Sequence, residues 1–464
     1  MNPSFELIKP RFMPSLDDNF RPAVLANRHF LEVLDREAGG GVPLALALCR
    51  KGKAVSRFET RVFPEGHARF SSNFAYVERV FKFLLWQKGA AKVYVGGPLA
   101  IGQYLQEIYS EHGPRKFDFH FMGEDVYGVP FMVIPCAFED VPAEEEIEQP
   151  LGGNLKGYRI GFDLGASDRK VSAVVDGKAI FSEEVVWNPV QQSDPEYHYR
   201  EVMASLKKAA SMMPRVDAIG GSSAGVYVNN SARIASLFRG VPKERFGEIR
   251  SLFARIQKEM GVPLEVVNDG EVTALAGSMS LEDTGVLGVA LGSSEAAGYV
   301  TLSGHITDWL NELAFAPIDY NPDGPIDEWS GDRGVGSQYF SQQCVFRLAP
   351  QAGIEIPADM LNADKLAYVQ KLLENGHEGA EKIWQSMGVY LGYGLAHYAQ
   401  FYKLKHVLIL GRCTSGRGGQ MLLEGARKVL ASEFPELTPI NIQLPDEKSR
   451  RVGQSIAAAS LPQV

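Results

Sequence analysis

Residues 158–177, YRIGFDLGASDRKVSAVVDG, place an acid and a turn of small residues between two predicted strands. The first, 158–162, is a short apolar run typical of a buried strand, and the second, 171–175, alternates as a strand does. Asp163 ends the first strand, and residues 165–167 form a tight turn. The stretch therefore predicts a β-hairpin with polar groups at its turn.

Such a turn can hold phosphate. Gly165 lets the backbone approach closely, Ser167 adds a hydroxyl and Lys170 adds a cation. Asp163 can bind Mg²⁺ through water. An ordinary hairpin with Asp and Gly in its turn is the alternative, and the hairpin alone favours that alternative.

The bulk composition narrows the class of protein. A chain of 464 residues is long enough for two or three domains. A net charge of −9 argues against a general nucleic-acid binder. The four cysteines are far apart and lack paired metal spacing, which predicts reduced thiols in a cytoplasmic protein. The sequence shows no signal peptide and no run long enough to span a membrane, so we do not expect a membrane as a partner. Because of the negative net charge, we do not expect nucleic acid as a partner either.

An acidic segment that ends in glycines, residues 139–157, predicts a boundary. Residues 1–150 before it form an N-terminal extension with an α/β pattern. Strands are predicted at 42–49, 54–63, 92–95, 117–121 and 131–134, and helices at 74–87 and 101–109. Their order loosely parallels the segment after residue 158, so we hypothesise that the extension is a degenerate copy of that part, without an acid equivalent to Asp163.

Residues 264–277, LEVVNDGEVTALAG, are the second informative block. A predicted buried strand ends in Asn268 and Asp269, and Gly270 allows the chain to turn into a helix. An aspartate in this position can accept a proton in catalysis, or it can simply cap the helix.

Three further blocks carry glycines or an acid after predicted strands. They are 218–228 (AIGGSSAGVYV), 286–300 (VLGVALGSSEAAGYV) and 407–419 (VLILGRCTSGRGG). A fourth, 308–319 (DWLNELAFAPID), contains Glu312. A single glycine-rich turn is weak support for a nucleotide site, but several in order are stronger.

From residue 158 to the C-terminus, about two thirds of the chain, these blocks resemble the motifs of ROK-family sugar kinases. That family belongs to the sugar kinase, actin and heat-shock-chaperone ATPase superfamily. The resemblance implies an α/β fold with two ribonuclease-H-like (actin-like ATPase) lobes around a cleft, plus the N-terminal α/β extension. The first lobe would be residues 158–275 with a C-terminal helix at 450–464, and the second lobe would be residues 276–449.

The resemblance also implies ATP-dependent phosphorylation of a hexose or amino sugar, with ATP and Mg²⁺ as cofactors and a homodimer as the assembly. Asp269 would be the general base, and Asp163 would hold Mg²⁺ through water. The sugar would contact Ser223, Gly225, Asn268 and Glu312. The nucleotide would contact Gly165, Ser167, Lys170, Gly292, Ser293 and Gly411.

Two departures from the family pattern matter. Phe315 stands where the family has a zinc-binding histidine, and the Cys-rich loop that should follow is missing, so we expect no structural zinc. In the second phosphate block, Glu295 is a candidate to repel ATP, unless it points away from the phosphates or helps to hold Mg²⁺. A carboxylate within about 4 Å of a phosphate charge would cost on the order of 1–4 kcal/mol.

These departures keep other functions open. One is a non-catalytic regulator that binds a sugar or nucleotide, and another is an ATPase coupled to a partner protein through the extension. ROK-family repressors carry a DNA-reading winged helix, and residues 27–36 faintly resemble its first helix. The strand-like residues that follow do not continue a helix-turn-helix, so DNA binding is not expected.

Overall fold

The computed structural model describes residues 5–50, 52–149, 151–445 and 447–464. Its packing divides the chain into two compact units. The first comprises Met1–Ile147, Val289–Ala296 and Trp309–Leu444, and the second comprises Glu148–Gly288, Ala297–Asp308 and Pro445–Val464. Within the described residues, no helix has the length and apolar character needed to cross a bilayer.

The second unit is built on a five-stranded sheet with the order β12-β9-β6-β7-β8. Strands β6, β7 and β8 are antiparallel, whereas β6, β9 and β12 are parallel. The strands are β6 (Tyr158–Leu164), β7 (Asp168–Val175), β8 (Lys178–Val186), β9 (Ala218–Ser223) and β12 (Leu264–Asn268). The predicted hairpin is present, but Asp163 lies inside β6, opposite Lys170, rather than after the strand.

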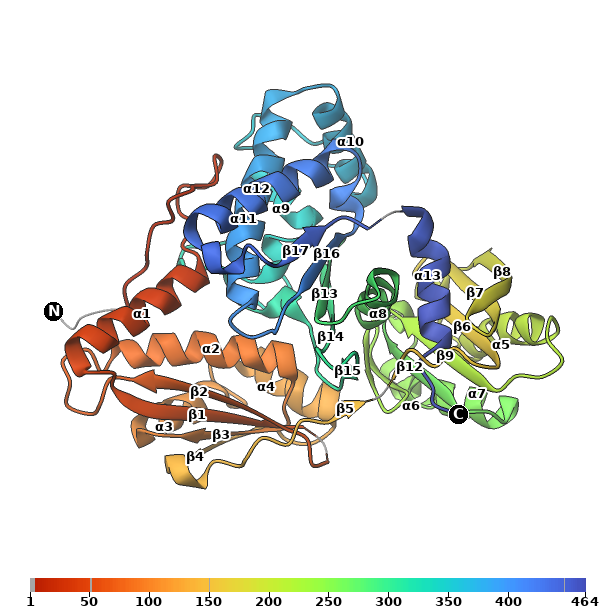
Figure 1. Cartoon of the computed structure of the whole chain (residues 1–464), viewed down its shortest axis with the longest axis horizontal. Coiled ribbons are helices and arrows are strands. Elements are labelled where there is room, and N and C mark those ends of the chain that lie inside the picture. Colours follow the sequence, from red (N-terminus) through yellow and green to blue (C-terminus); the bar gives the residue numbers. More distant parts are fainter. Residues whose placement is uncertain (1–4, 51, 150, 446) are drawn as a thin grey trace. The chain divides into compact units, whose positions relative to one another are not determined.

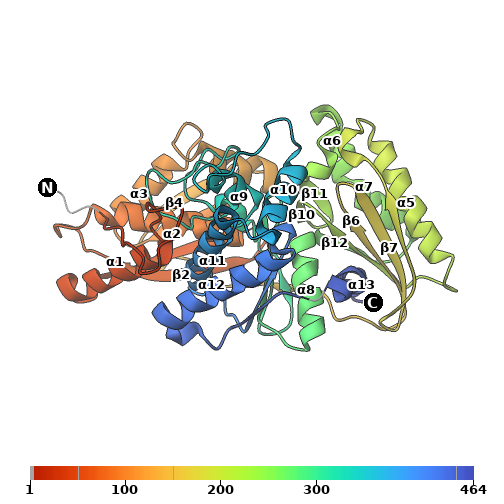
Figure 2. The ribbon, with the colours of Figure 1, turned by 90° about the horizontal axis from the view of Figure 1, so that it is seen from above.

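Helices cover both faces of this sheet (Figure 2). On one face lie α5 (Pro195–Ala210) and α7 (Leu252–Met260), and on the other lie α8 (Asp269–Leu281) and α13 (Glu447–Ala459). Side chains of a strand alternate between faces. Ile160 and Phe162 therefore enter the core with α5 and α7, while Gly161 faces α13.

The rest of the second unit consists of short elements. These are α6 (Phe246–Arg250), the hairpin β10 (Val226–Val228) and β11 (Ser231–Ile234), and β5 (Glu148–Gln149) and β15 (Ile306–Thr307). Strand β15 pairs antiparallel with β5 and with Val300 of β14 (Glu295–Val300).

The extension forms the four-stranded sheet β2-β1-β3-β4 in the first unit. Figure 1 shows α2 lying along one face of this sheet. The predicted strands and helices correspond to β1 (Val42–Cys49), β2 (Val55–Val62), α2 (Ser72–Lys88), β3 (Lys92–Gly96), α3 (Leu99–Ile108) and β4 (Met132–Cys136), after the helix α1 (Ala23–Ala38). Lys51, in the turn between β1 and β2, lies outside the described residues.

Two expectations about the extension are wrong. The predicted strand at 117–121 is instead the helix α4 (Lys116–His120), followed by the π-helical turn η1 (Phe121–Tyr127). In this helix Asp118 is buried and accepts hydrogen bonds from Lys82 and Trp86 of α2, contacts that the local sequence does not show. The hypothesis of a degenerate copy also fails, because β1 and β3 are antiparallel whereas the corresponding β6 and β9 are parallel.

The remainder of the first unit contains strands in the order β17-β16-β13-β14. Only the end of β13 and the start of β14 belong to this unit, because its middle segment is Val289–Ala296. Helices α11 and α12 pack side by side (Figure 1), and the Cα of Gly425 lies 3.1 Å from where a Cβ of Gly388 would be. The elements are β13 (Val286–Leu291), α9 (Gln342–Leu348), α10 (Asn362–Glu374), α11 (Glu378–Tyr398), β16 (His406–Leu410), α12 (Arg417–Glu433) and β17 (Asn441–Gln443).

The two units differ from the three parts expected from the sequence. Residues 1–147 share a unit with residues 309–444, so the extension packs as part of the same body as most of the expected second lobe. The expected boundary at residue 275 falls inside α8, which ends at Leu281.

The close approach of α13 to the sheet gives a first prediction. A Cβ on Gly161 would overlap the carbonyl oxygen of Ser455 in α13. We expect Gly161→Ala to lower the free energy of unfolding by about 2 kcal/mol, because a backbone atom must move. The measurement is urea unfolding followed by circular dichroism. Gly453→Ala is the control, since it lies in the same helix with open space around it and should be neutral or stabilising. Equal effects of the two changes would contradict the packing argument.

Candidate active site

The carboxyl ends of three parallel strands bring several predicted residues together in the second unit. The register places Asp163 of β6 beside Ser222 of β9, and Ser223 beside Asn268 of β12. Ser222 Oγ donates a hydrogen bond of 2.7 Å to Asp163 Oδ1. Ligands of α/β proteins bind outside the carboxyl ends of parallel strands, so this edge is the candidate site.

Asp269 begins α8 at this edge. Asn268, not Asp269, is the N-cap: its Oδ1 accepts a 2.7 Å hydrogen bond from Gly270 N, while its Nδ2 donates to Gly225 O at 2.7 Å. Asn268 thus fixes the turn and Gly225. Burial raises the pKa of Asp269 to about 6, and the negative charge of Asp163 adds to the rise. A carboxylate with this pKa can exchange protons near neutral pH.

The turn of the β6–β7 hairpin is richer in charge than the sequence suggested. Lys170 Nζ lies 3.9 Å from Asp163 Oδ2 and 3.2 Å from Asp168 Oδ1. Ser167 Oγ also donates to Asp168, at 3.2 Å, and Gly165 N donates to Asp168 O at 2.9 Å. Two carboxylates beside one ammonium fit a hydrated divalent cation that carries phosphate better than they fit bare phosphate. Asp168 was missed, although its position two residues before Lys170 was visible.

Tyr227 is a second residue that the sequence analysis did not assign. Its hydroxyl forms a 2.6 Å hydrogen bond with Ser223 Oγ, and burial raises its pKa, with a further contribution from Asp269. Asn230, at the turn of the β10–β11 hairpin, bonds both Leu264 O (2.8 Å) and Val266 N (2.7 Å), which attaches the hairpin to β12. Two features of the sequence could have indicated this hairpin: the small-residue turn before Tyr227 and the Asn229–Asn230 pair. In the structure the φ angles of these asparagines are 51° and 59°, which suit a tight hairpin.

The expected second phosphate loop lies in the first unit. Gly292 N donates to Ser294 O at 3.0 Å, Gly292 O accepts from Gln342 N at 2.9 Å, and Ser293 is exposed. Glu295 does not face solvent with them. It is 2% exposed and its Oε1 accepts a 2.7 Å hydrogen bond from the Tyr398 hydroxyl. Burial raises its pKa to about 8, and the charge of Glu312 adds to the rise. Glu295 is therefore mostly neutral at neutral pH, and its burial against Tyr398 favours the alternative in which it does not repel ATP.

Gly411 and Glu312 also lie in the first unit. Gly411 has a φ of 94°, and a Cβ there would overlap the backbone of Leu291, so close packing by itself requires glycine. Glu312 is half-buried, and its backbone N donates to Trp86 O at 3.0 Å. Contacts of these residues with a nucleotide or a sugar remain predictions.

Phe315, at the position that corresponds to the family's zinc-binding histidine, lies in an aromatic cluster. The ring of Phe315 lies 4.4 Å from that of Trp86. In the part of the chain that the structure describes, no group of three or more His, Cys, Asp and Glu side chains is arranged to hold a metal ion.

Comparison with known proteins shows a likeness of fold. No family model matches the chain, and no curated protein matches its sequence. The ROK hexokinase from Thermus thermophilus matches with a TM-score of 0.50 and 18% identity, covering 65% of this chain and 98% of that one. A ROK family glucokinase from Streptomyces griseus, in complex with glucose and AMPPNP, has a TM-score of 0.47 and 19% identity, covering 65% and 99%. A putative N-acetylmannosamine kinase from Listeria monocytogenes has a TM-score of 0.49 and 15% identity, covering 65% and 97%.

The match to the ROK hexokinase from Thermus thermophilus confirms the predicted α/β fold class. Over about two thirds of its length, the chain has the fold of that structure. About a third of the chain lies outside the match.

The buried carboxyl of Glu295 predicts a pH-dependent stability. Its pKa is raised from 4.5 to about 8, so the stability it contributes is full below pH 4.5 and is lost as the pH rises through 8. Within that window the loss amounts to about 1 kcal/mol per pH unit. The melting temperature of the wild type should therefore fall relative to that of Glu295→Gln between pH 5 and pH 9. Glu355→Gln, which alters an exposed carboxyl of the same unit, should show no such divergence. Parallel curves for wild type and Glu295→Gln would disprove the shift.

Proposed function

We propose that this protein is a kinase that transfers phosphate from ATP to a hexose or amino sugar, with Asp269 as the general base. The observation that carries the proposal is the Asp269 carboxyl, whose pKa of about 6 suits proton transfer, beside Asp163 at the carboxyl ends of β6, β9 and β12. The fold of ROK-family sugar kinases supports the reaction class.

In this proposal Asp269 accepts the proton of the attacking sugar hydroxyl, while Ser223 and Gly225 contact the sugar from β9 and the turn after it. Asn268 acts chiefly by fixing this turn, since its amide already bonds Gly225 O and Gly270 N. Glu312 accepts hydrogen bonds from sugar hydroxyls. Phosphoryl transfer depends mainly on positioning and charge stabilisation, and these groups supply positioning.

Asp163 and Asp168 would hold Mg²⁺ through water, with Ser222 orienting Asp163. When bound, Mg²⁺ neutralises charge on the phosphates. Lys170 and Ser167 on the hairpin turn, and Gly292 and Ser293 on the loop of the first unit, contact the phosphates. Gly165 and Gly411 let the backbone approach the nucleotide.

A regulator that binds a sugar without turnover is the second candidate. The observation that favours it is the bond from Gly165 N to Asp168 O, because this amide is already used within the turn. Catalysis and simple binding are separated by the experiments below.

Replacement of the base should abolish turnover and spare binding. We expect Asp269→Asn to lower the rate of sugar-dependent ADP release by at least about 100-fold, because the proton acceptor is lost. In the wild type, kcat/KM should fall tenfold per pH unit below about pH 6, where Asp269 becomes protonated. The assay is coupled ADP release with a panel of hexoses and amino sugars.

Glu282→Gln, an exposed acid at the other end of α8, is the control and should leave turnover unchanged. Full activity of Asp269→Asn would remove Asp269 from catalysis. Sugar binding without turnover by the wild type would favour the regulator.

Neighbouring serines of β9 should affect different ligands. Ser222→Ala removes the hydrogen bond to Asp163 and should raise the Mg²⁺ concentration for half-maximal activity about tenfold, with little change in the KM for sugar. Ser223→Ala, which frees Tyr227, should instead raise the KM for sugar. The test is to measure the activity of each variant first as a function of Mg²⁺ concentration and then as a function of sugar concentration. Equal changes in both dependences for the two variants would contradict the assignment.

A further inference from the structure

Trp329 is an unusually exposed aromatic side chain in a well-packed part of the first unit. It is 59% exposed, whereas Trp86 and Trp384 are fully buried. Its ring contacts those of Phe315 (5.2 Å), Phe117 (5.7 Å) and Phe121 (5.9 Å), with interplanar angles of 69–76°. The indole therefore stands edge-to-face against three aromatic rings, an arrangement that fixes its orientation.

The loop that carries Trp329 is held by hydrogen bonds of its own. Asp327 N donates to Asp332 O, and Gly331 N donates to Asp327 O, both at 2.8 Å. The carboxylate of Asp327 accepts from Ser330 N and Oγ at 2.8 Å and from Ser337 Oγ at 2.9 Å. These hydrogen bonds hold the backbone of the loop on both sides of Trp329.

Asp332, at the end of the loop, is anchored by three cations of the extension. Arg115 lies 2.7 Å from its carboxylate, Lys82 3.0 Å and Arg79 3.4 Å. Glu78 and Asp118 balance these charges. Lys82, Glu78, Asp118 and Asp332 are buried, and the two arginines are partly buried. The extension therefore fixes the loop and, with Phe117 and Phe121, the ring on its tip.

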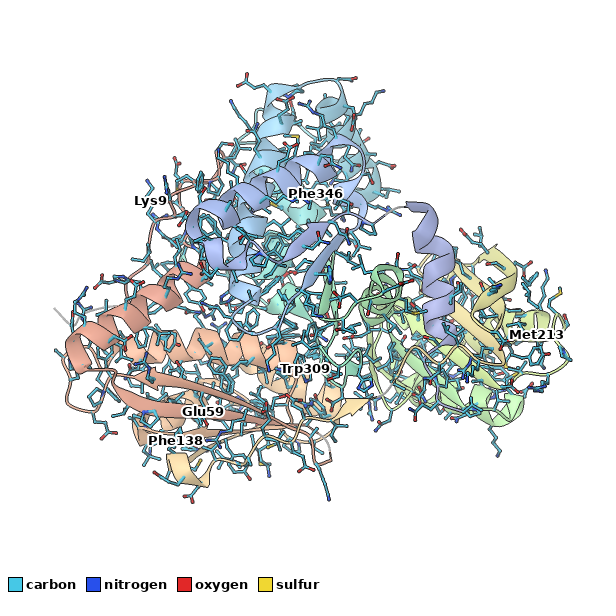
Figure 3. The ribbon with its side chains drawn as sticks, in the orientation of Figure 1. Lys9, Glu59, Phe138, Met213, Trp309 and Phe346 are labelled. Carbon is cyan, nitrogen blue, oxygen red and sulfur yellow. The ribbon has the colours of Figure 1, made fainter. Side chains whose placement is uncertain are left out.

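The same aromatic cluster includes Phe315, which lies close in the chain to Glu312, a residue predicted to contact the sugar. Phe315, which contacts Trp329, ends the short turn η6 (Leu313–Phe315) directly after Glu312. The C-terminal end of α2 supports this segment, because Gln87 O and Trp86 O accept hydrogen bonds from the backbone N of Asn311 and Glu312. Trp309, labelled in Figure 3, starts the segment, and Lys88 Nζ lies 2.8 Å from the centre of its ring.

The surroundings of Trp329 suit a sugar ring better than a protein. A stable protein interface buries about 800 Å² per partner and has an apolar centre. On residues 321–334 the large apolar side chains with high exposure are Trp329 and Ile326 (49%), whereas Asp323, Glu328 and Arg333 are exposed polar groups. One preorganised aromatic face among charged hydrogen-bonding groups matches a pyranose, which has an apolar C–H face and a rim of hydroxyls.

We propose that Trp329 is a sugar-stacking residue, against whose indole a hexopyranose binds with its C–H face, on a platform that the N-terminal extension holds in place. This inference rests on the proposed function for its ligand class. It gives the extension a role in substrate binding and makes Trp329 a determinant of sugar affinity.

The test is calorimetric titration of the full-length protein with D-glucose, D-mannose and N-acetyl-D-mannosamine, without nucleotide. For a sugar that the wild type binds, Trp329→Ala should raise the Kd about tenfold, and Trp329→Tyr, which keeps an aromatic face, should stay within about threefold. Ile326→Ala is the matched control, because it removes a similarly exposed apolar side chain of the same loop and should change the Kd less than about twofold. Circular dichroism establishes that each variant is folded.

Several results would overturn the proposal. They are an unchanged Kd in Trp329→Ala, an equal loss in Ile326→Ala, and no binding of any of the three sugars by the wild type. A change of oligomeric state in Trp329→Ala with unchanged sugar binding would also overturn it, and would identify a contact between copies. The two proposals fail separately. Sugar binding that depends on Trp329, with no turnover by the wild type, supports this inference and contradicts the kinase, whereas turnover by the wild type that Trp329→Ala leaves unchanged does the reverse.

Discussion

The candidate site depends on the parallel pairing of β6, β9 and β12. Parallel strands end at the same edge of a sheet, so Asp163 meets Ser222, 59 positions further along the chain, and Ser223 meets Asn268, 45 positions further along. The register decides which atoms meet: Ser222 lies beside Asp163 and orients its carboxylate, whereas Ser223 lies beside Asn268 and bonds Tyr227. A shift of one residue would turn these side chains to the opposite face. The approach of α13 to Gly161 and Gly220 holds the sheet in this arrangement from behind.

Burial gives two carboxyl groups different properties. Asp269 and Glu295 both have raised pKa values because they are removed from water. Asp269 lies at the sheet edge with a second carboxylate nearby, and its pKa of about 6 leaves it mostly ionised at neutral pH. Glu295 bonds a tyrosine in the core of the first unit, and its pKa of about 8 leaves it mostly protonated. The first can serve as a base, and the second contributes to packing.

The extension is joined to the first unit by charge as well as by apolar contacts. Arg79, Lys82 and Arg115 surround Asp332, and Trp86 and Gln87 bind the backbone before η6. Buried ion pairs contribute less to stability than their number suggests, because desolvation offsets their attraction, but they define a specific geometry. That geometry places the 327–332 loop and its exposed tryptophan. The segment stands where the family resemblance would place a Cys-rich loop, and ion pairs and aromatic contacts hold it.

The sequence by itself determined the local elements. The apolar runs and the glycines around 158–177 and 264–277 indicated the hairpin, the strand β12 and the start of α8, because strand and helix periods and turn residues act over a few positions. It also predicted Asp163 and Asp269 as site residues, and both lie at the same edge of the sheet. It failed at 117–121, which is helical and where Asp118 bonds Lys82, a residue 36 positions away. Only the tertiary structure decided the antiparallel pairing of β1 and β3, the hydrogen bond from Ser222 to Asp163, the burial of Glu295 and the exposure of Trp329. Each of these features depends on contacts between residues far apart in the chain or on removal from water. A local sequence pattern encodes neither long-range contacts nor burial.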